Sequence, residues 1–236
     1  MATIDCTGLP VRDINRAIKN YVAAGASEIT LTNPRGQHNL SVAILEPVHI
    51  RIEGSVGYYC AGMIDQATVE ISGSAGWGLA EAMFDGTVIM RGSAGNGAAA
   101  SIRSGTVVIQ GDAAARAGVS MKGGLVLIGG NCGYMAGFMG QKGMLIVCGD
   151  AGAAFADSMY ETVCFVGGQI AELGNDATVE SLTAEEYDVL AATLAQHLPA
   201  KLEEPDFSID RFKKVVAGRK LWNFDSQDWA TWKEAL

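Results

Sequence analysis

The sequence predicts a mainly β protein, a right-handed parallel β-helix of about seven rungs, where one rung is a 19-residue turn of the solenoid. The first observation is a column of glycines that recurs every 19 residues without insertion: Gly54, Gly73, Gly92, Gly111, Gly130, Gly149 and Gly168. The second is the pattern before each glycine, where apolar residues alternate with a period of two, as in a strand. A short fixed period with one strand in each repeat is typical of stacked solenoids.

Two apolar columns define the expected core of residues 48–173. Alternate residues of a strand face the same side, so the residues four and two positions before each column glycine share one face. The first column is Ile50, Val69, Val88, Val107, Val126, Leu145 and Cys164, and the second is Ile52, Ile71, Met90, Ile109, Ile128, Val147 and Val166. Stacking at about 4.8 Å brings like residues together, so we expect both columns inside the solenoid.

The column between these two should face outward. It reads Arg51, Glu70, Ile89, Val108, Leu127, Ile146 and Phe165. An apolar stripe from Ile89 to Phe165 should be covered, because large exposed apolar patches mark interfaces. Two covers remain open at this stage: the C-terminal helix of the chain itself, or a partner subunit for which these five residues are the candidate interface.

Residues 1–47 read as an N-terminal αβ cap, which closes the exposed strand edges at one end of a solenoid. The stretch DINRAIKNYVAAG has helical apolar spacing, with Asp13 as the expected N-cap and Gly25 just beyond the helix. SEITLT follows as a strand, and NPRGQHNLSVAIL is a turn-rich approach to the first rung.

Residues 174–236 read as C-terminal helices and an aromatic tail. A capping box, Thr183 with Glu186, begins one helix, and Pro199 lies beyond its end. The spacing of the apolar residues at 209, 212, 215 and 216 predicts a short second helix that ends at Gly218. Three tryptophans in the tail are candidate interface anchors, with folding back into the core as the alternative: Trp222, Trp229 and Trp232.

Composition excludes several classes of protein. The net formal charge of −9 argues against nucleic acid or an anionic membrane as the main partner. No apolar run approaches the roughly 18 residues of a membrane span, and the first residues do not resemble a secretory signal. Five cysteines without a CxxC spacing fit reduced thiols in a cytoplasmic protein.

The sequence contains no motif that would bring reactive side chains together. The histidines fall in separate predicted elements: His38, His49 and His197. Histidine-bound zinc occurs in trimeric left-handed β-helices, but their six-residue period does not divide 19. The glycine spacing GxxGxG differs from the nucleotide-binding GxGxxG. Asp112 and Asp150, directly after column glycines, are expected as solvated turn carboxylates. We therefore predict no catalytic, cofactor-binding or metal-binding residue in this chain.

The glycine pattern G-x-x-G-x-x-x-[GA] on a 19-residue rung resembles the GXGXG domain, over roughly residues 4–173. That domain is the β-helix at the C-terminal end of the large subunit of glutamate synthase, and it also forms the β-helical subunit of formylmethanofuran dehydrogenases. The segment ITLTNPRGQHNLSVAIL and the rung GDAGAAFADSMYETVCFVGG are similar to the glutamate-synthase type.

A chain of this size is similar to the middle subunit of split glutamate-synthase-like complexes, such as N-methylglutamate synthase. The resemblance implies a non-catalytic scaffold that joins a class II amidotransferase-like subunit to a synthase subunit carrying FMN and an iron-sulfur cluster. In such families the nucleophilic cysteine belongs to the amidotransferase part, and Cys6 here is internal. Two alternatives remain: a formylmethanofuran-dehydrogenase-type subunit in C1 transfer, and a self-sufficient homo-oligomeric enzyme with a site between subunits.

Overall fold

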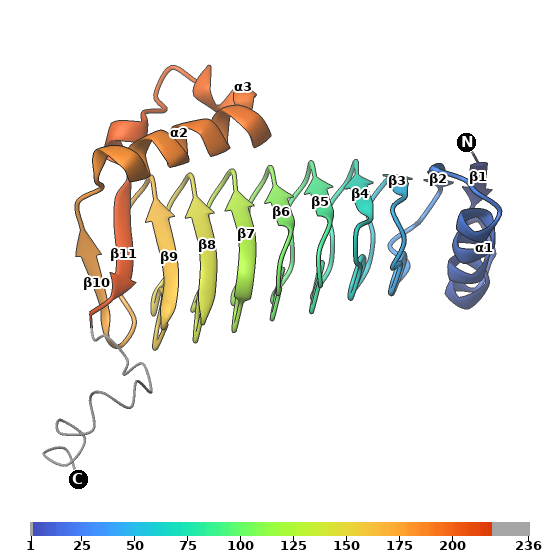
Figure 1. Cartoon of the computed structure of the whole chain (residues 1–236), viewed down its shortest axis with the longest axis horizontal. Coiled ribbons are helices and arrows are strands. Elements are labelled where there is room, and N and C mark those ends of the chain that lie inside the picture. The colour runs from blue at the N-terminus through green and yellow to red at the C-terminus, as the bar shows by residue number, and fades with distance from the viewer. Residues whose placement is uncertain (1, 219–236) are drawn as a thin grey trace, which may run out of the picture.

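The computed structural model describes residues 2–218 as a solenoid built on one continuous sheet of 11 strands (Figure 1). Nine strands are parallel and follow the chain in order: β1 (Ala2–Asp5), β2 (Glu28–Thr32), β3 (His49–Glu53), β4 (Thr68–Ile71), β5 (Thr87–Met90), β6 (Thr106–Ile109), β7 (Lys122–Ile128), β8 (Lys142–Val147) and β9 (Glu161–Val166). The pairs from β3 to β9 keep the 19-residue register, as in Ile50 opposite Val69. The predicted β-solenoid of about seven 19-residue rungs is therefore confirmed.

The two predicted inner columns form the core. Every residue in both columns is at most 1% exposed. A second inner ladder follows the glycine corner, where single parallel bridges join small apolar residues of successive rungs, beginning with Val56, Ala75 and Ala94. The interior is therefore lined by one sheet and a narrow opposite wall.

The solenoid begins before the first glycine of the column. Strand β2 pairs in parallel with β3, with Ile29 opposite Ile50, so residues 28–47 form a further rung of slightly greater length. Helix α1 (Val11–Ala23) closes this end and fully buries Ile14 and Ile18. The Asn15 side-chain amide accepts a hydrogen bond from the Ser41 backbone N–H at 2.8 Å and donates one to the Asn39 carbonyl at 2.7 Å. These bonds satisfy backbone groups that the end of a stack leaves open.

The start of α1 differs from the expectation. The helix begins at Val11 with Pro10 at the N-cap, so Asp13 lies within the first turn. Proline fixes φ near the helical value, which favours a helix start, and an acidic residue in the first turn complements the positive end of the helix dipole.

The C-terminal end combines helices with two strands that the sequence did not predict. Helices α2 (Ala184–His197) and α3 (Pro199–Leu202) follow β10 (Ala177–Glu180). The expected helix up to Gly218 is wrong: a short 3-10 turn (Ile209–Arg211) leads into β11 (Lys213–Ala217). Strand β11 inserts between β9 and β10, antiparallel to both. Its Val215 enters the core at 0% exposure, because the alternation of β11 matches the two faces of the sheet.

The glycine column permits a polar ladder between rungs. From Gly54 to Gly149, the side chain of the residue after each column glycine accepts a hydrogen bond from the backbone N–H of its counterpart one rung later. The distances are 3.0 Å from the Asp112 N–H to Ser93 Oγ, 2.7 Å from the Asn131 N–H to Asp112 Oδ1, and 2.7 Å from the Gln169 N–H to Asp150 Oδ1. Asp112 and Asp150 are thus exposed, as expected, but they also bind the next rung.

The same ladder explains why the column is glycine. A Cβ on Gly111 would lie 2.6 Å from Ser93 Oγ and 2.8 Å from the Gly92 carbonyl oxygen. The φ angle of Gly111 is not in the left-handed region, so the constraint here is close approach of neighbouring rungs. The column is therefore architectural.

The turn segment between the second inner ladder and the next strand has a different backbone conformation. Tyr59, Ala61 and Met63 all have left-handed φ angles of 54–57°, and the same alternating pattern recurs along the stack. Their N–H groups bond to neighbouring rungs, as from Ala61 to the Leu40 carbonyl and from Met63 to the Glu81 carbonyl, both at 2.9 Å. A left-handed conformation costs about 1–2 kcal/mol per non-glycine residue, which the stacked hydrogen bonds offset.

No helix within residues 2–218 is long and apolar enough to cross a lipid bilayer. The three candidate anchors Trp222, Trp229 and Trp232 lie outside the described residues.

The glycine column makes a first prediction. Gly111→Ala should lower the free energy of unfolding by about 2–3 kcal/mol, because the new Cβ meets backbone that cannot move without breaking the stack. Urea unfolding followed by circular dichroism measures the change. Gly62→Ala is the matched control, since its Cβ would meet nothing closer than 3.5 Å. Equal losses in the two variants would contradict the close-approach argument.

The polar ladder makes a second prediction. Asp112→Ala should lower the free energy of unfolding by about 1 kcal/mol, because the Asn131 N–H loses its acceptor. Asp112→Asn keeps an oxygen at the same place and should unfold at nearly the wild-type urea concentration. If Asp112→Asn were as unstable as Asp112→Ala, the charge and not the hydrogen bond would be the stabilising feature.

Candidate functional site

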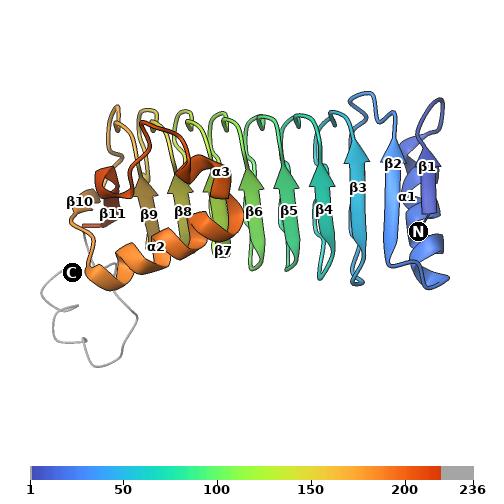
Figure 2. The same cartoon turned by 90° about the horizontal axis from the view of Figure 1, so that it is seen from above.

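The apolar stripe on the outer sheet face lies under the protein's own helices. Val108, Leu127, Ile146 and Phe165 are at most 1% exposed. They form a second hydrophobic cluster with residues from the C-terminal region: Leu190, Leu194 and Leu198 of α2 and its end, and Phe212 before β11. Figure 2 shows α2 and α3 lying across the strands at the C-terminal end of the solenoid. The sequence allowed two covers for the stripe, the C-terminal helix of the chain itself or a partner subunit. In the described residues, the chain's own helix α2 covers it.

The helical cover makes most of the stripe unavailable to a partner subunit. Four of the five candidate residues cannot touch a partner while α2 is in place, because the helix removes them from solvent. Ile89 is the exception: it is partly buried, lies on β5 and packs at the margin of the same cluster. Of the five stripe residues predicted as an interface, Ile89 therefore remains accessible to a partner, at the margin where α2 and α3 end.

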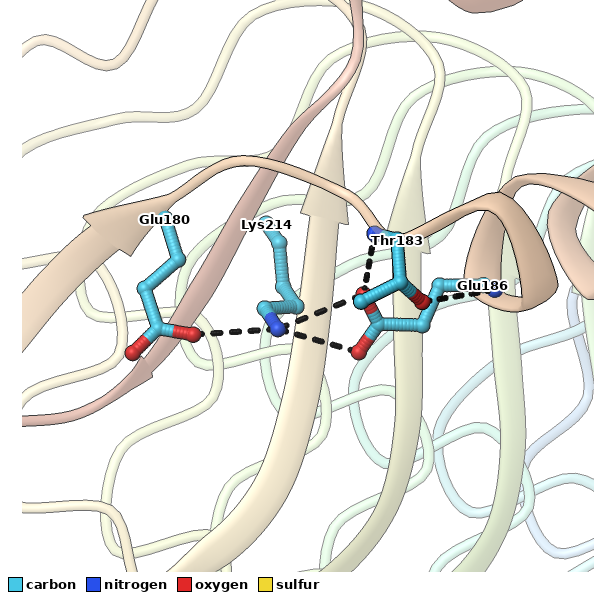
Figure 3. Close-up of polar contacts among 4 residues, drawn as sticks. All are labelled: Glu180, Thr183, Glu186 and Lys214. Carbon is cyan, nitrogen blue, oxygen red and sulfur yellow. Dashed lines mark hydrogen bonds and ion pairs between the residues drawn. The ribbon is translucent and has the colours of Figure 1, made fainter.

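A buried lysine holds the covering helix in place (Figure 3). Lys214 Nζ lies 3.0 Å from Glu180 Oε2 on β10 and 3.0 Å from Glu186 Oε1 on α2. Glu186 also completes the predicted capping box, since its carboxylate accepts the Thr183 N–H and its own N–H bonds to Thr183 Oγ1. We call Lys214, Glu180, Glu186 and Thr183 the Lys214 cluster; it links β10, β11 and the first turn of α2.

The charges of this cluster stabilise one another. The pKa of Glu186 is held below its usual range, chiefly by the hydrogen bond from the Thr183 backbone and then by Lys214. The pKa of Lys214 is raised by its hydrogen bonds to Glu180 and Glu186. The Glu186 contribution to stability is therefore complete above its unfolded pKa of about 4.3 and is lost as the pH falls through the lower folded value. The Lys214 contribution is complete below about pH 10.4 and is lost as the pH rises through its raised folded value.

Beyond the helical cover, the same sheet face is open. A groove of about 350 Å³ follows the ends of β3, β4 and β5 and reaches the residue after β6. Its outward-facing lining continues the stripe and the neighbouring outer column: Arg51, Glu53, Glu70, Ser72, Ile89, Arg91 and Gln110. Of these outward-facing residues Ile89 alone is apolar, and the buried Ile52 and Ile71 complete the lining, so charged and polar side chains replace the apolar stripe where α2 and α3 stop.

The charges in the groove are partly paired. Glu70 Oε1 lies 2.8 Å from His49 Nε2, and Arg51 Nη1 lies 3.9 Å from Glu28 Oε2. Arg91 and Glu53 differ from these: within residues 2–218, neither side chain makes a hydrogen bond or an ion pair. One unpaired cation and one unpaired anion thus remain in the groove, two strands apart.

An exposed aromatic ladder lies on a different side of the first rungs. The rings of His38, Tyr58 and Trp77 stack with centroids 4.4 and 5.3 Å apart. Trp77 is 53% exposed, and a Cβ on Gly95 in the next rung would lie 2.7 Å from its ring. Sequence analysis missed this ladder. Its signal is an aromatic residue four positions after the column glycine in successive rungs.

The cysteines do not form a reactive or metal-binding group. Burial raises the pKa of all five thiols, to about 12 for Cys60 and Cys148 and about 11 for Cys132. A thiol of such high pKa is a poor nucleophile near neutral pH. In the part of the chain that the structure describes, no three His, Cys, Asp or Glu side chains are arranged to hold a metal ion.

Comparison with known proteins identifies a relative of almost the same length. No known family model matches the chain. The chain is 47% identical to "Protein GlxC" of Rhizobium meliloti (strain 1021) over 227 residues, which cover 95% of this chain and 97% of that protein. A match of this identity over almost the full length of both chains reflects common descent and a common fold.

The Lys214 cluster makes a third prediction. Lys214→Met should lower the free energy of unfolding by about 1–2 kcal/mol, because it leaves two carboxylates without their cation; Glu180 is 53% and Glu186 29% exposed, so water compensates part of the loss. It should also speed amide hydrogen exchange in α2, measured by mass spectrometry, because the helix loses its anchor to β11.

Lys213→Met is the control, since among residues 2–218 the Lys213 Nζ bonds only to the Gly168 carbonyl, at 3.5 Å. The wild type should lose this stabilisation as the pH falls below about 4, whereas Lys214→Met should lose less over the same range. Equal exchange in α2 for both variants would show that the cluster does not hold the helix.

Proposed function

This chain belongs to the family of protein GlxC, and we propose that it is a non-catalytic β-helix subunit of a glutamate-synthase-like complex. The observation that carries the proposal is the glycine column, which forms the corners of a 19-residue solenoid, the pattern by which the sequence resembles the GXGXG domain. In this role the chain supplies a rigid body that holds two partner subunits at a fixed separation.

We further propose that the complex is an N-methylglutamate synthase, which converts methylamine and glutamate to N-methylglutamate and ammonia. A class II amidotransferase-like subunit would then bind one part of this chain. A synthase subunit that carries FMN and an iron-sulfur cluster would bind another. The division of labour is supported by the chemistry of the described residues, whose thiols are buried and whose ion pairs at Lys214 link structural elements.

The alternative of a self-sufficient enzyme requires converging reactive groups. Histidines illustrate the difficulty. His38 stacks on Tyr58, His49 pairs with Glu70, and His197 lies at the end of α2. An acid-base or nucleophilic site needs such groups within hydrogen-bond reach of one another, and here each has a separate local role.

The fourth prediction concerns the whole complex. The tagged chain purified under native conditions from its own cells should retain two further subunits and show flavin absorbance. The same chain produced alone should fold, by its β-type circular dichroism, and should contain no flavin. Only the complex should form N-methylglutamate from methylamine and glutamate, as measured by mass spectrometry.

Stoichiometric flavin in the chain produced alone would overturn the non-catalytic role. A native complex without flavin that transfers a one-carbon group would favour the formylmethanofuran-dehydrogenase-type alternative. A flavin complex that is inactive with methylamine but active with another amine would preserve the scaffold role and exclude the specific substrate.

A further inference from the structure

Part of the outer sheet face already packs against a helix of the same chain. On β6–β9, α2 runs along the solenoid and places Leu190, Leu194 and Leu198 against the outer column (Figure 2). These residues are four apart, so each leucine advances about 6 Å along the helix while each rung advances about 4.8 Å. A helix along the solenoid axis can therefore contact successive rungs with successive turns.

The open groove continues this face in the same direction. Strands β3–β5 carry the same two outward columns that α2 and α3 cover farther along. Ile89 packs against the covered cluster at its margin and also lines the groove, so the apolar contact surface extends past the end of the cover. The groove is thus continuous with an interface that is built for a helix.

The unpaired charges of Arg91 and Glu53 lie apart in the groove along the solenoid axis, so the groove is electrostatically asymmetric. Arg91 follows β5, and Glu53 ends β3, so two rungs, about 10 Å, separate them along the axis. Glu70 on the intervening rung and Arg51 on the same strand as Glu53 already have partners, in His49 and Glu28. A ligand that complements this groove carries an anion near Arg91, an apolar group over Ile89 and a cation near Glu53. On a helix the two charges would lie about six or seven residues apart.

We propose that this groove docks an amphipathic helix of a partner subunit, laid along the solenoid axis beyond α2, with a carboxylate at Arg91 and a basic side chain at Glu53. The inference rests on the proposed function in assuming a hetero-oligomer. A second copy of this chain fits less well, because α1 and α2, the two long helices among residues 2–218, both bury their apolar faces in their own chain.

The experiment uses the native complex with a photo-crosslinker in the groove. Ile89→p-benzoylphenylalanine should, on irradiation, form a crosslink to a helical segment of a partner subunit, identified by peptide mass spectrometry. The crosslinked segment should contain an acidic and a basic residue six or seven positions apart. Tyr160→p-benzoylphenylalanine is the control, since Tyr160 is exposed outside the groove and should not crosslink to that segment.

Charge reversal tests the chemistry of docking. Arg91→Glu and Glu53→Arg should each weaken the complex about tenfold at low salt, and less at high salt, as measured by the dissociation constant of the purified subunits. Lys19→Glu makes the same charge change as Arg91→Glu on the exposed side of α1 and should leave affinity unchanged. Circular dichroism verifies that all three variants are folded.

Each outcome decides the inference separately from the proposed function. Crosslinking of Ile89 to residues 219–236 of the same chain, to a second copy, or to nothing in an intact flavin complex would overturn the docking site and leave the scaffold role standing. Unchanged affinity of Arg91→Glu would also overturn it. A crosslink to a partner helix in a complex that lacks flavin would support the docking site while contradicting the proposed function.

Discussion

The close approach of successive rungs at one corner is the constraint on which the rest of the structure depends. At Gly73, Gly92 and Gly111, the space that a Cβ would occupy is taken by a side-chain oxygen and backbone of the preceding rung. That oxygen accepts a backbone N–H of its own column in the next rung, as Ser74 Oγ does from Ser93 at 3.1 Å. Because each corner locks to the one before it, the strands remain in register and the inner columns stack without interruption. A flat, regular outer face then follows, and that face can accept a helix.

Much of this architecture could be predicted from the sequence because it is repeated. A 19-residue period in glycine and a two-residue period in apolar residues are independent signals that agree, and the Thr183–Glu186 capping box is a local motif. The segment around Val215 had no such redundancy. Its apolar spacing fits a helix as well as a strand, and pairing with β9 decided the outcome. The polar ladder also escaped prediction, because Ser, Asn and Asp after a glycine are typical of any solvated turn.

The candidate site could be located only in part, for a related reason. A sequence shows that the stripe from Ile89 to Phe165 is apolar, but not which surface covers it. The cover packs on the stripe through distant residues such as Leu190, and the Lys214 cluster joins residues 28 positions apart, Lys214 and Glu186. Such a contact leaves no periodic signal. The groove is defined by where that cover ends, so Arg91 and Glu53 become distinctive only once α2 and α3 are in place.

The division of one sheet face into a covered half and an open half bears on how a scaffold can act. If the whole stripe were a partner interface, the free chain would expose five adjacent large apolar residues and would tend to associate without specificity. Covering the apolar half with its own helix leaves a shorter open surface in which charge, and not apolar area, selects the partner. Ile89, which is partly buried, lies at the boundary between the two halves. A partner that places an anion at Arg91, after β5, and a cation at Glu53, on β3, must lie in one direction along the solenoid. A fixed direction is what a subunit that holds two others apart has to supply.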